Sequence, residues 1–515
     1  MKLARVATIT AVLVDEGLGY LTRSSTDSAE ASAEAPEPPP GEDEVARRLR
    51  RTLERLGPTF VKFGQMLATR VDLFDEPFIE ELSKLHASVE PFPTEQAFQL
   101  LADELGRPVD DVFAEIGDAP VAAASIAQVY RARLRGDEEA WVAVKVQRPG
   151  LEESLLSDLD ALLVLSGFID RLVPPYRRSM VHRVAEEYAL RARAETDFLA
   201  EARAVQRFEE VLATLPSFRV PQLHPAFTTP RVLVMQWMEG TKLSDVPTVE
   251  ALQGLGFDPE TFCRAMLELQ LVMAYDHGFL HGDTHPGNLI LAPDGTVGLI
   301  DFGLHGEVPR ALRDKMLEML FKQANGELDE AVDAFVQVFV PEPGLDVDAF
   351  KAELRVVLAE GCESGPIAEH RVTEQLVRGM RVGAKYRARA QSDLFMVIRN
   401  LTIVEGILLR YYPSMDAAAE VRTITAGILR RRLFGPQLRA EMGQLLPDLA
   451  LTLSQRPKLA ARLLKLERAL HDAPTLGDFL RREGVLREPT PTHPASYVAV
   501  ALLGVLVGLA IAWMA

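Results

Sequence analysis

Cysteine is scarce in this chain of 515 residues, and its 56 basic residues are outnumbered by 74 acidic ones. Only Cys263 and Cys362 occur, far apart, so neither a disulfide framework nor a zinc site is implied and a reducing compartment is expected. The formal net charge of −18 argues against nucleic-acid binding, because phosphate backbones select basic surfaces. Asp15 and Glu16 interrupt the first apolar stretch, so we expect no secretory signal peptide.

The composition that remains is that of an ordinary globular protein, with 48% hydrophobic and 25% charged residues. A chain of this length has room for two or three domains with an ample core. Residues 24–44 are acidic, rich in proline and free of aromatic residues, which predicts a disordered linker.

Most of the chemical information lies in His281-Gly-Asp-Thr-His-Pro-Gly-Asn288 and in Asp301-Phe-Gly303, which follows it. A phosphoryl-transfer site needs a carboxylate near the attacking hydroxyl, and oxygen ligands that hold magnesium against nucleotide phosphates. Asp283, Asn288 and Asp301 fit these roles in that order. We therefore predict Asp283 as the catalytic base or orienting residue, and the other two as metal ligands.

The local pattern around these residues supports a shared metal site. The apolar segments 289–291 and 297–300 flank the sequence Ala-Pro-Asp-Gly-Thr, which predicts two short strands joined by a tight turn. Such a hairpin would carry Asn288 and Asp301 to the same end. Ligands of one metal ion must lie close together, so this placement is the required one.

A lysine upstream supplies a candidate phosphate contact. Lys145 ends the sequence Val-Ala-Val-Lys in a predicted strand, whose alternation turns Ala143 and Lys145 to one face. Such a lysine can reach the α- and β-phosphates if a carboxylate on the following helix orients it. Glu195, Asp197 and Glu201 are the candidates, and only one of them can pair with Lys145.

The glycine-rich loop that cradles phosphates in ordinary protein kinases is missing. Its place is taken by Val121, Ala122, Ala123, Ala124 and Ser125. Alanine disfavours positive φ and carries a methyl group, so this loop cannot approach phosphates as glycine does. The substitution indicates altered nucleotide handling.

Apolar periodicity predicts an α+β, bilobal protein-kinase-like fold, in which a small and partly β lobe precedes a mostly helical lobe. Strands are expected over 126–134, 141–146 and 231–237, and a long helical region over 151–215. The predicted domains are a helical segment (1–23), the linker (24–44), a helical extension (45–115), an N-lobe with a helical insertion (116–240), a C-lobe (241–440), a basic helical segment with a linker (441–495) and a transmembrane anchor (496–515).

The predicted anchor is an uncharged run from Tyr497 to Trp513, long enough for a thin hydrocarbon core and bounded by interfacial aromatics. Gly504 and Gly508 form a small-residue face that could pack a second copy of the helix into a dimer. A buried core helix is the alternative. Residues 430–468 carry nine basic and three acidic residues, which predicts either contact with an anionic membrane or a solvated helical face.

Taken together, these motifs resemble the atypical kinase family called ABC1, UbiB, ADCK or AarF, which is linked to coenzyme Q biosynthesis. The resemblance runs from about residue 50 to residue 415. Lys62-Phe-Gly-Gln65 resembles the KxGQ element of the family, Ala122-Ala-Ala-Ser125 its alanine-rich loop, and Glu195-Thr-Asp197 its ExD element.

The resemblance assigns positions to residues that the motifs alone leave open. It implies that Lys62 and Gln65 lie on helices that cover the active site, where a protein substrate would otherwise dock. It also implies that Glu195 and Asp197 receive Lys62, and that Glu201 is the partner of Lys145.

The resemblance also concerns the adenine site, where hinge backbone at Gln236 and Met238 would hold the base. Gln236 stands where the family often has glutamate, and Val71 where it often has proline. Family members often carry two C-terminal membrane helices, whereas this chain has one clear span.

We therefore expect a kinase or ATPase that uses ATP or ADP with Mg²⁺ in isoprenoid quinone biosynthesis. It would be anchored in the bacterial inner membrane, with a cytoplasmic catalytic domain that acts on water or on a lipid-like quinone precursor. A small-molecule phosphotransferase of the aminoglycoside or choline kinase type is the first alternative, and a nucleotide-gated lipid-binding module is the second.

Overall fold

The computed structural model describes residues 2–18, 41–68, 70, 73–85, 91–136, 141–172, 180–362 and 365–434. Residues 1–428 form one compact unit, which contains every element that positions the predicted site. The greater part of the predicted linker and everything predicted beyond residue 434, including the anchor with Gly504 and Gly508, lie outside the described residues. Among the described helices, none is both long and apolar enough to span a membrane.

An antiparallel sheet forms the N-lobe in the order β1-β3-β4-β6, and β2 also pairs with β3. Its strands are β1 (Phe113–Ile116), β2 (Ala122–Ala123), β3 (Ala127–Leu134), β4 (Trp141–Gln147) and β6 (Val232–Gln236). Each of the three longer strands lies within one or two residues of its predicted bounds.

Alternation along β4 places its side chains on two faces, as predicted. Val142, Val144 and Val146 share a core with α5 (Thr94–Leu105) and α6 (Val109–Val112) on one face. Ala143 packs with Phe198 of α9 on the other. Lys145 therefore points between the sheet and α9, away from the apolar core of α5.

The region predicted as one long helical stretch over 151–215 contains three helices: α7 (Leu151–Ile169), α8 (Met180–Ala194) and α9 (Phe198–Leu212). Asp197 ends the turn between α8 and α9 and acts as the N-cap of α9, accepting a hydrogen bond from the backbone N of Leu199. This turn contains the Glu195-Thr-Asp197 motif.

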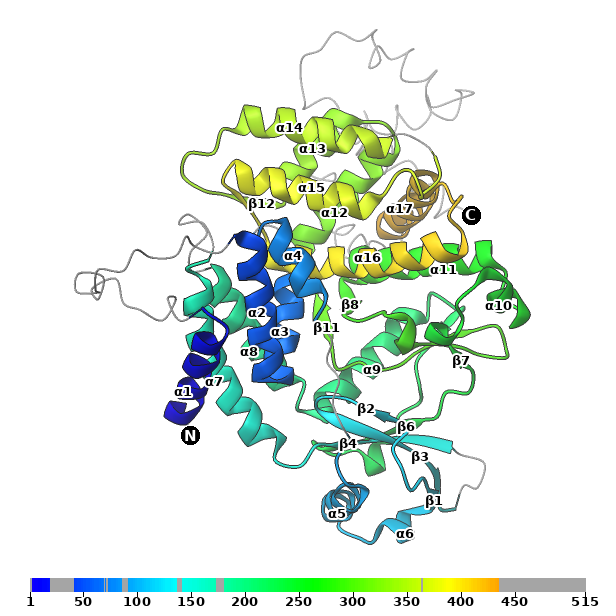
Figure 1. Ribbon diagram of the computed structural model, residues 1–515. Coiled ribbons are helices and arrows are strands. Elements are labelled where there is room, and N and C mark those ends of the chain that lie inside the picture. The colour runs from blue at the N-terminus through cyan, green and yellow to red at the C-terminus, as the bar shows by residue number, and fades with distance from the viewer. Residues whose placement is uncertain are drawn as a thin grey trace, which may run out of the picture. The chain divides into compact units, whose positions relative to one another are not determined.

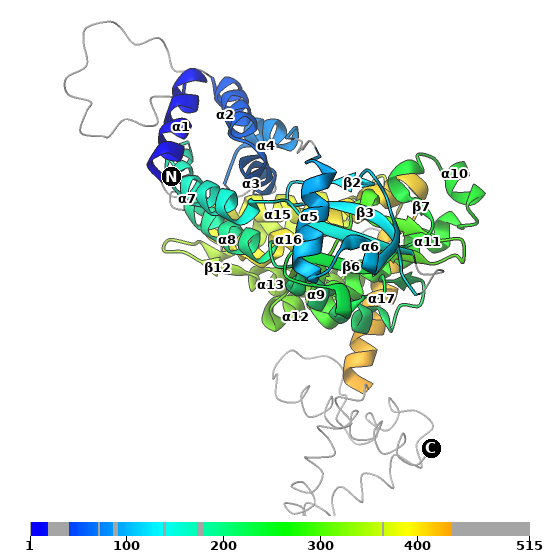
Figure 2. The same cartoon turned by 90° about the horizontal axis from the view of Figure 1, so that it is seen from below.

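The first four helices pack against α7 and α8 in one apolar core, separate from the core of the sheet (Figures 1 and 2). They are α1 (Lys2–Asp15), α2 (Glu42–Leu56), α3 (Pro58–Ala68) and α4 (Glu76–Ser83). The extension predicted over 45–115 therefore divides, because α5 and α6 belong to the sheet. Helix α2 also begins inside the predicted linker, where acidic residues at 42–44 favour a helix N-terminus.

In the C-lobe, β9 and β10 form the predicted hairpin within a sheet of order β5-β10-β9-β7. A second pair joins β8 to β11, and a third joins β12 to β13. The strands are β5 (Phe218–Arg219), β7 (Thr241–Lys242), β8 (Phe279–His281), β9 (Leu289–Leu291), β10 (Val297–Leu299), β11 (His305–Glu307), β12 (Phe339–Pro341) and β13 (Ala388–Ala390).

Helices α11 and α16 pack together in the C-lobe, and α12 to α15 pack against one another and against α16 (Figure 1). The helices are α10 (Val249–Gly254), α11 (Pro259–Leu271), which continues as a π-helix (Val272–His277), α12 (Arg310–Ala324), α13 (Leu328–Val336), α14 (Val347–Ala359), α15 (Val372–Lys385), α16 (Ser392–Tyr411) and α17 (Ala417–Phe434). Short 3₁₀ turns cover Pro225–Phe227, Leu243–Asp245, Pro286–Asn288 and Glu360–Cys362.

Gly240, which follows β6, lies where the backbones of the two lobes approach each other closely. Its φ is +146°, and a Cβ there would lie 2.3 Å from the carbonyl oxygen of Leu291 in β9. Gly240→Ala should therefore lower the free energy of unfolding by about 2 kcal/mol or more. Urea denaturation followed by circular dichroism measures the change.

The matched control is Gly167→Ala in α7, where an added Cβ would have no neighbour within 4 Å. This exposed helical position should gain about 0.5–1 kcal/mol from the higher helix propensity of alanine. Equal stability of the two variants would contradict the close approach of Gly240 to β9.

Candidate active site

A cavity of about 790 Å³ lies between the N-lobe sheet, the N-terminal helices and residues 282–288, which we call the catalytic loop after their predicted role. It brings together most of the residues singled out in the sequence: Lys62, Gln65, Ala122, Ala123, Ala124, Ser125, Lys145, Glu195, Gln236, Met238, Asp283, Asn288 and Asp301. Glu201 lies behind Lys145 rather than in the cavity wall, and Asp197 lies at the start of α9.

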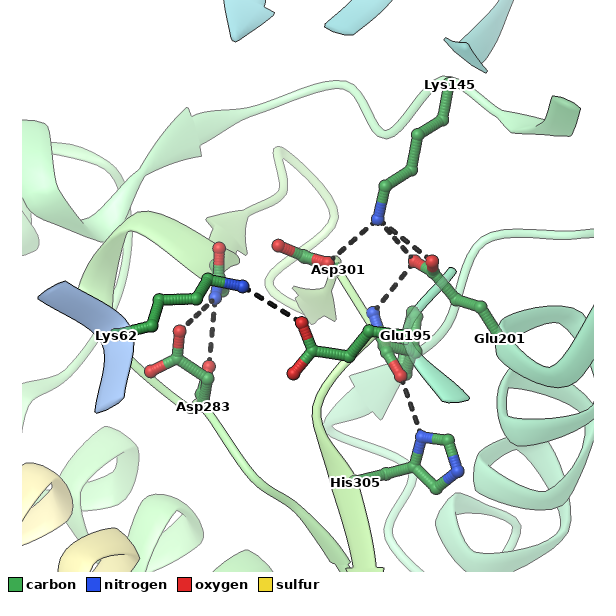
Figure 3. A network of polar contacts seen from close by, with 9 residues as sticks. Lys62, Lys145, Glu195, Glu201, Asp283, Asp301 and His305 are labelled. Atoms are coloured by element: carbon green, nitrogen blue, oxygen red, sulfur yellow. Dashed lines mark hydrogen bonds and ion pairs between the residues drawn. The ribbon is translucent and has the colours of Figure 1, made fainter. Parts of the chain in front are cut away.

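Lys145 holds two carboxylates at once (Figure 3). Its Nζ lies 2.8 Å from Oε1 and 2.9 Å from Oε2 of Glu201, and 3.0 Å from Oδ1 of Asp301. Lys145 and Glu201 are buried, whereas about half of the Asp301 side chain is exposed to the cavity. The pairing of Lys145 with Glu201 that the resemblance implies is thus present in the structure.

The pKa values of this group follow from its burial and charges. Burial by itself would lower the pKa of Lys145, but the carboxylates of Asp301 and Glu201 outweigh it and raise that pKa. Burial raises the pKa of Glu201, and the Lys145 ammonium acts against that shift. The same ammonium lowers the pKa of Asp301 to about 2, so Asp301 is a carboxylate at neutral pH.

Glu201 also fixes the backbone directly after Asp301. The backbone N of Phe302 donates to Oε1 of Glu201 at 3.3 Å, and the Phe302 ring packs against Phe208 of α9. Asp301 itself adopts φ +60°, an unusual conformation for a residue other than glycine. Contacts on both sides of this residue hold its side chain toward Lys145.

The catalytic loop is organised around Asp283. The Nδ2 of Asn288 donates to the backbone oxygen of Asp283 at 3.0 Å and to its Oδ2 at 3.4 Å. The Nδ1 of buried His281 accepts from the backbone N of Asp283 at 3.2 Å, and burial lowers the pKa of this histidine. His281 is therefore a neutral structural acceptor that shapes the loop.

Helix α16 supplies residues that the sequence analysis missed. Nη2 of Arg399 lies 3.4 Å from Oδ1 of Asp283, and Thr284 donates to Oδ1 of buried Asn400 at 3.4 Å. Phe395 and Met396 of the same helix also line the cavity. These residues belong to an amphipathic segment more than a hundred positions beyond Asp283, and no motif marks them.

An ion pair joins the N-terminal helices to the site. Nζ of Lys62 in α3 lies 2.9 Å from Oε2 of Glu195 in the α8–α9 turn (Figure 3). The Nε2 of Gln65 donates to the backbone oxygen of Leu85 at 2.9 Å, which fixes α3 to the residues just after α4. Tyr188 of α8 donates to the backbone oxygen of Thr59, and so adds a second link between α3 and α8.

The assignment of Asp197 as a second partner of Lys62 is wrong. Oδ1 of Asp197 caps α9 through the backbone N of Leu199 at 3.0 Å, and its Oδ2 lies 3.4 Å from Nη2 of Arg203. The physical reason is position, since the residue before the first turn of a helix accepts hydrogen bonds from that turn. Among the described residues, Lys62 pairs with Glu195.

The alanine-rich loop and the hinge bound the N-lobe side of the cavity. Ala122 and Ala123 are strand β2, paired with Val129 and Gln128 of β3. This backbone is therefore an extended edge rather than an open glycine loop. The Oε1 of Gln236 accepts from the backbone N of Gln222 at 3.4 Å, so this side chain is engaged within the N-lobe.

Few residues separate Gly303 from the next helix, α12. After Gly303 the chain forms β11, which pairs with β8 through His305 and His281, and α12 begins at Arg310. His305 also contacts the backbone oxygen of Phe302 at 2.9 Å. This leaves no room for the long activation loop on which a protein kinase seats a peptide.

The oxygen donors present suit Mg²⁺. Asn288 uses its Nδ2 on Asp283, which leaves its Oδ1 available, and Asp301 exposes part of its carboxylate to the cavity. Within the described part of the chain, no cluster of three His, Cys, Asp or Glu side chains could hold a metal by itself. Magnesium typically takes one or two protein ligands and completes its shell with phosphates and water, which fits this pair.

The site combines a buried lysine–glutamate pair, a loop with an aspartate and an asparagine, and a second aspartate at the end of a hairpin. This combination is typical of a protein-kinase-like fold. The model of the ABC1 atypical kinase-like domain matches residues 84–335. The chain belongs to this family. The match favours the kinase-like interpretation over the aminoglycoside or choline kinase alternative.

Relatives in bacteria and chloroplasts bear names from this family. The chain is 30% identical over 393 residues to the probable protein kinase UbiB of Marinobacter nauticus, covering 76% of this chain and 71% of that protein. It is 32% identical over 379 residues to the chloroplastic ACTIVITY OF BC1 COMPLEX KINASE 3 of Arabidopsis thaliana, covering 73% of this chain and 52% of that protein. The chain spans about half the length of the chloroplastic ACTIVITY OF BC1 COMPLEX KINASE relatives 1 and 3 of Arabidopsis thaliana.

Among solved structures, Rv3197 of Mycobacterium tuberculosis, determined in a complex with erythromycin, has the same fold. The TM-score is 0.51 at 24% identity, and the match covers 75% of this chain and 96% of that one.

The Asp301–Lys145 contact predicts a pH dependence of stability. Lys145 lowers the pKa of Asp301 from 3.8 to about 2, so the ionised carboxylate stabilises the folded state above about pH 4. That contribution is lost as the pH falls toward 2. The stability advantage of the wild type over Asp301→Asn should therefore shrink as the pH is lowered from 5 to 3, as measured by urea denaturation. A difference that stays constant across this range would contradict the contact.

Proposed function

We propose that this protein is an atypical kinase or ATPase that binds a nucleoside triphosphate or diphosphate with Mg²⁺ in the described cavity. The observation that carries the proposal is the double contact of Lys145 with Glu201 and Asp301 at the cavity wall. A buried ammonium held by a carboxylate on a neighbouring helix is the arrangement that positions nucleotide phosphates. The match to the ABC1 atypical kinase-like domain supports the same interpretation.

Each polar residue of the cavity has a proposed role. Lys145 contacts the α- and β-phosphates, and Glu201 keeps it oriented and charged. Asn288 and Asp301 hold Mg²⁺, which when bound neutralises charge on the phosphates. The base lies among Ala143, the hinge and Ile290, beneath the alanine-rich loop that takes the place of a glycine loop.

Asp283 takes part in the transfer itself. An acceptor oxygen forms a bond to the γ-phosphorus of the nucleoside triphosphate. The bond from that phosphorus to the bridging oxygen breaks, and the nucleoside diphosphate leaves with that oxygen. The acceptor proton passes to Asp283, whose position is fixed by Asn288 and Arg399. When the acceptor is water, the same steps amount to nucleotide hydrolysis.

The acceptor side of the cavity favours a small amphipathic molecule over a polypeptide. Beyond Asp283 the wall is formed by Met66, Tyr188, Phe395 and Met396, together with charged groups that include Arg399. Helix α3 closes this side through the Lys62–Glu195 ion pair. We propose a lipid-like or isoprenoid quinone precursor as the acceptor or regulator, in line with the UbiB relative.

The proposal extends to location. The uncharged run within residues 496–515 would anchor the protein in the bacterial inner membrane, with the catalytic domain on the cytoplasmic side. An apolar acceptor dissolved in that membrane would then be within reach of the site.

Asp301→Asn tests the nucleotide mechanism. Loss of this carboxylate removes a metal ligand, so Mg-ADP binding, measured by calorimetry, should weaken markedly, and ATP turnover should fall by about 100-fold or more. The matched control is Asp333→Asn on α13, where the wild-type carboxylate pairs with Lys351 at the surface. Variants indistinguishable in binding and turnover would contradict the proposal.

Quinone content tests the biological assignment. In a bacterial strain lacking its own UbiB gene, the wild-type protein should restore isoprenoid quinone, measured by chromatography of lipid extracts. Asp301→Asn should fail and Asp333→Asn should succeed. Equal restoration by all three proteins would contradict a catalytic role in quinone biosynthesis, and no restoration by the wild type would contradict the pathway.

A further inference from the structure

The hinge between the lobes, residues 236–240, is fixed by backbone contacts at both ends. At its start, the backbone N of Gln236 donates to the oxygen of Gln222 at 2.7 Å, and that of Trp237 to the oxygen of Trp141 at 2.8 Å. At its end, Gly240 lies directly against the carbonyl of Leu291. Between these anchors lie Met238 and Glu239, and Met238 lines the cavity.

One side chain, Arg131 of β3, spans this middle portion. Its guanidinium carbon lies 4.1 Å from the ring centroid of Trp141 and 5.2 Å from that of Trp237. Its Nη2 lies 2.9 Å from Oε1 of Glu239. Arg131 therefore contacts the residue on each side of Met238, although it does not line the cavity itself.

We propose that Arg131 is a positioning residue that holds the hinge in the conformation that receives the nucleotide base. The inference rests on the proposed function, because it assumes that the base binds at this hinge. Guanidinium stacks on aromatic faces and pairs with carboxylates, and Arg131 does both within one short segment. Holding the hinge before the ligand arrives reduces the ordering cost of binding.

Arg133 provides a matched comparison on the same strand and the same face. Its guanidinium carbon lies 5.7 Å from the Trp141 ring, and its Nη2 lies 3.3 Å from Oε2 of Glu115. It thus stacks on the same tryptophan and forms a similar surface ion pair, but its partners belong to the sheet. An effect confined to Arg131 therefore reports on the hinge rather than on arginine stacking in general.

The experiment measures Mg-ADP binding by calorimetry and ATP turnover for Arg131→Leu, Arg131→Lys and Arg133→Leu in the full chain. Arg131→Leu should raise Kd and KM by roughly three- to tenfold, the range expected from losing exposed cation–π and ion-pair contacts. Its kcat at saturating ATP should be unchanged. Arg131→Lys should recover part of the loss, and Arg133→Leu should bind like the wild type.

A double-mutant cycle identifies the route of the effect. Glu239→Gln should weaken binding in the same direction, and its combination with Arg131→Leu should be less than additive. Wild-type affinity in Arg131→Leu, or equal weakening in Arg131→Leu and Arg133→Leu, would overturn the inference while leaving the proposed function intact. Failure of the wild type to bind Mg-ADP would overturn the proposed function and this inference with it.

Discussion

The ammonium of Lys145 is withdrawn from water, and two carboxylates from opposite lobes compensate its charge. Glu201 comes from α9 and Asp301 from the end of the β9–β10 hairpin, so this one group ties the N-lobe sheet to the C-lobe. Removing either partner would leave a buried charge only partly compensated, which is costly in a low-dielectric interior. The contact also fixes α9 relative to the Phe302 backbone, because Glu201 accepts from both Lys145 and the backbone N of Phe302.

The additions to the kinase-like fold are arranged around the same group. In chain order, helices α7 and α8 come after the strand that carries Lys145 and before the helix that carries Glu201. They share one apolar core with α1 to α4. The Lys62–Glu195 pair then joins α3 to the turn that leads into α9. The cover and the lysine–glutamate pair are therefore connected through one short stretch of chain, residues 195–201.

Much of this arrangement could be predicted from local sequence. The strands around Lys145 and the hairpin after Asn288 have clear periodicity, and the structure places these strands close to their predicted bounds. The division of the extension, with α5 on the sheet and α2 to α4 on α7 and α8, could not be predicted, because both groups have the same helical pattern. Arg399 and Arg131 escaped notice for a related reason: their partners are distant in sequence, and an isolated arginine predicts no particular contact.

The short passage from Gly303 to α12 has a consequence for control of this protein. Many protein kinases are switched by a modified loop at this point, and here a three-residue strand occupies it. Lys145, Glu201 and Asp301 are therefore already in contact although no long loop follows Gly303. A modification in this segment would act on a strand paired with β8 rather than on a free loop.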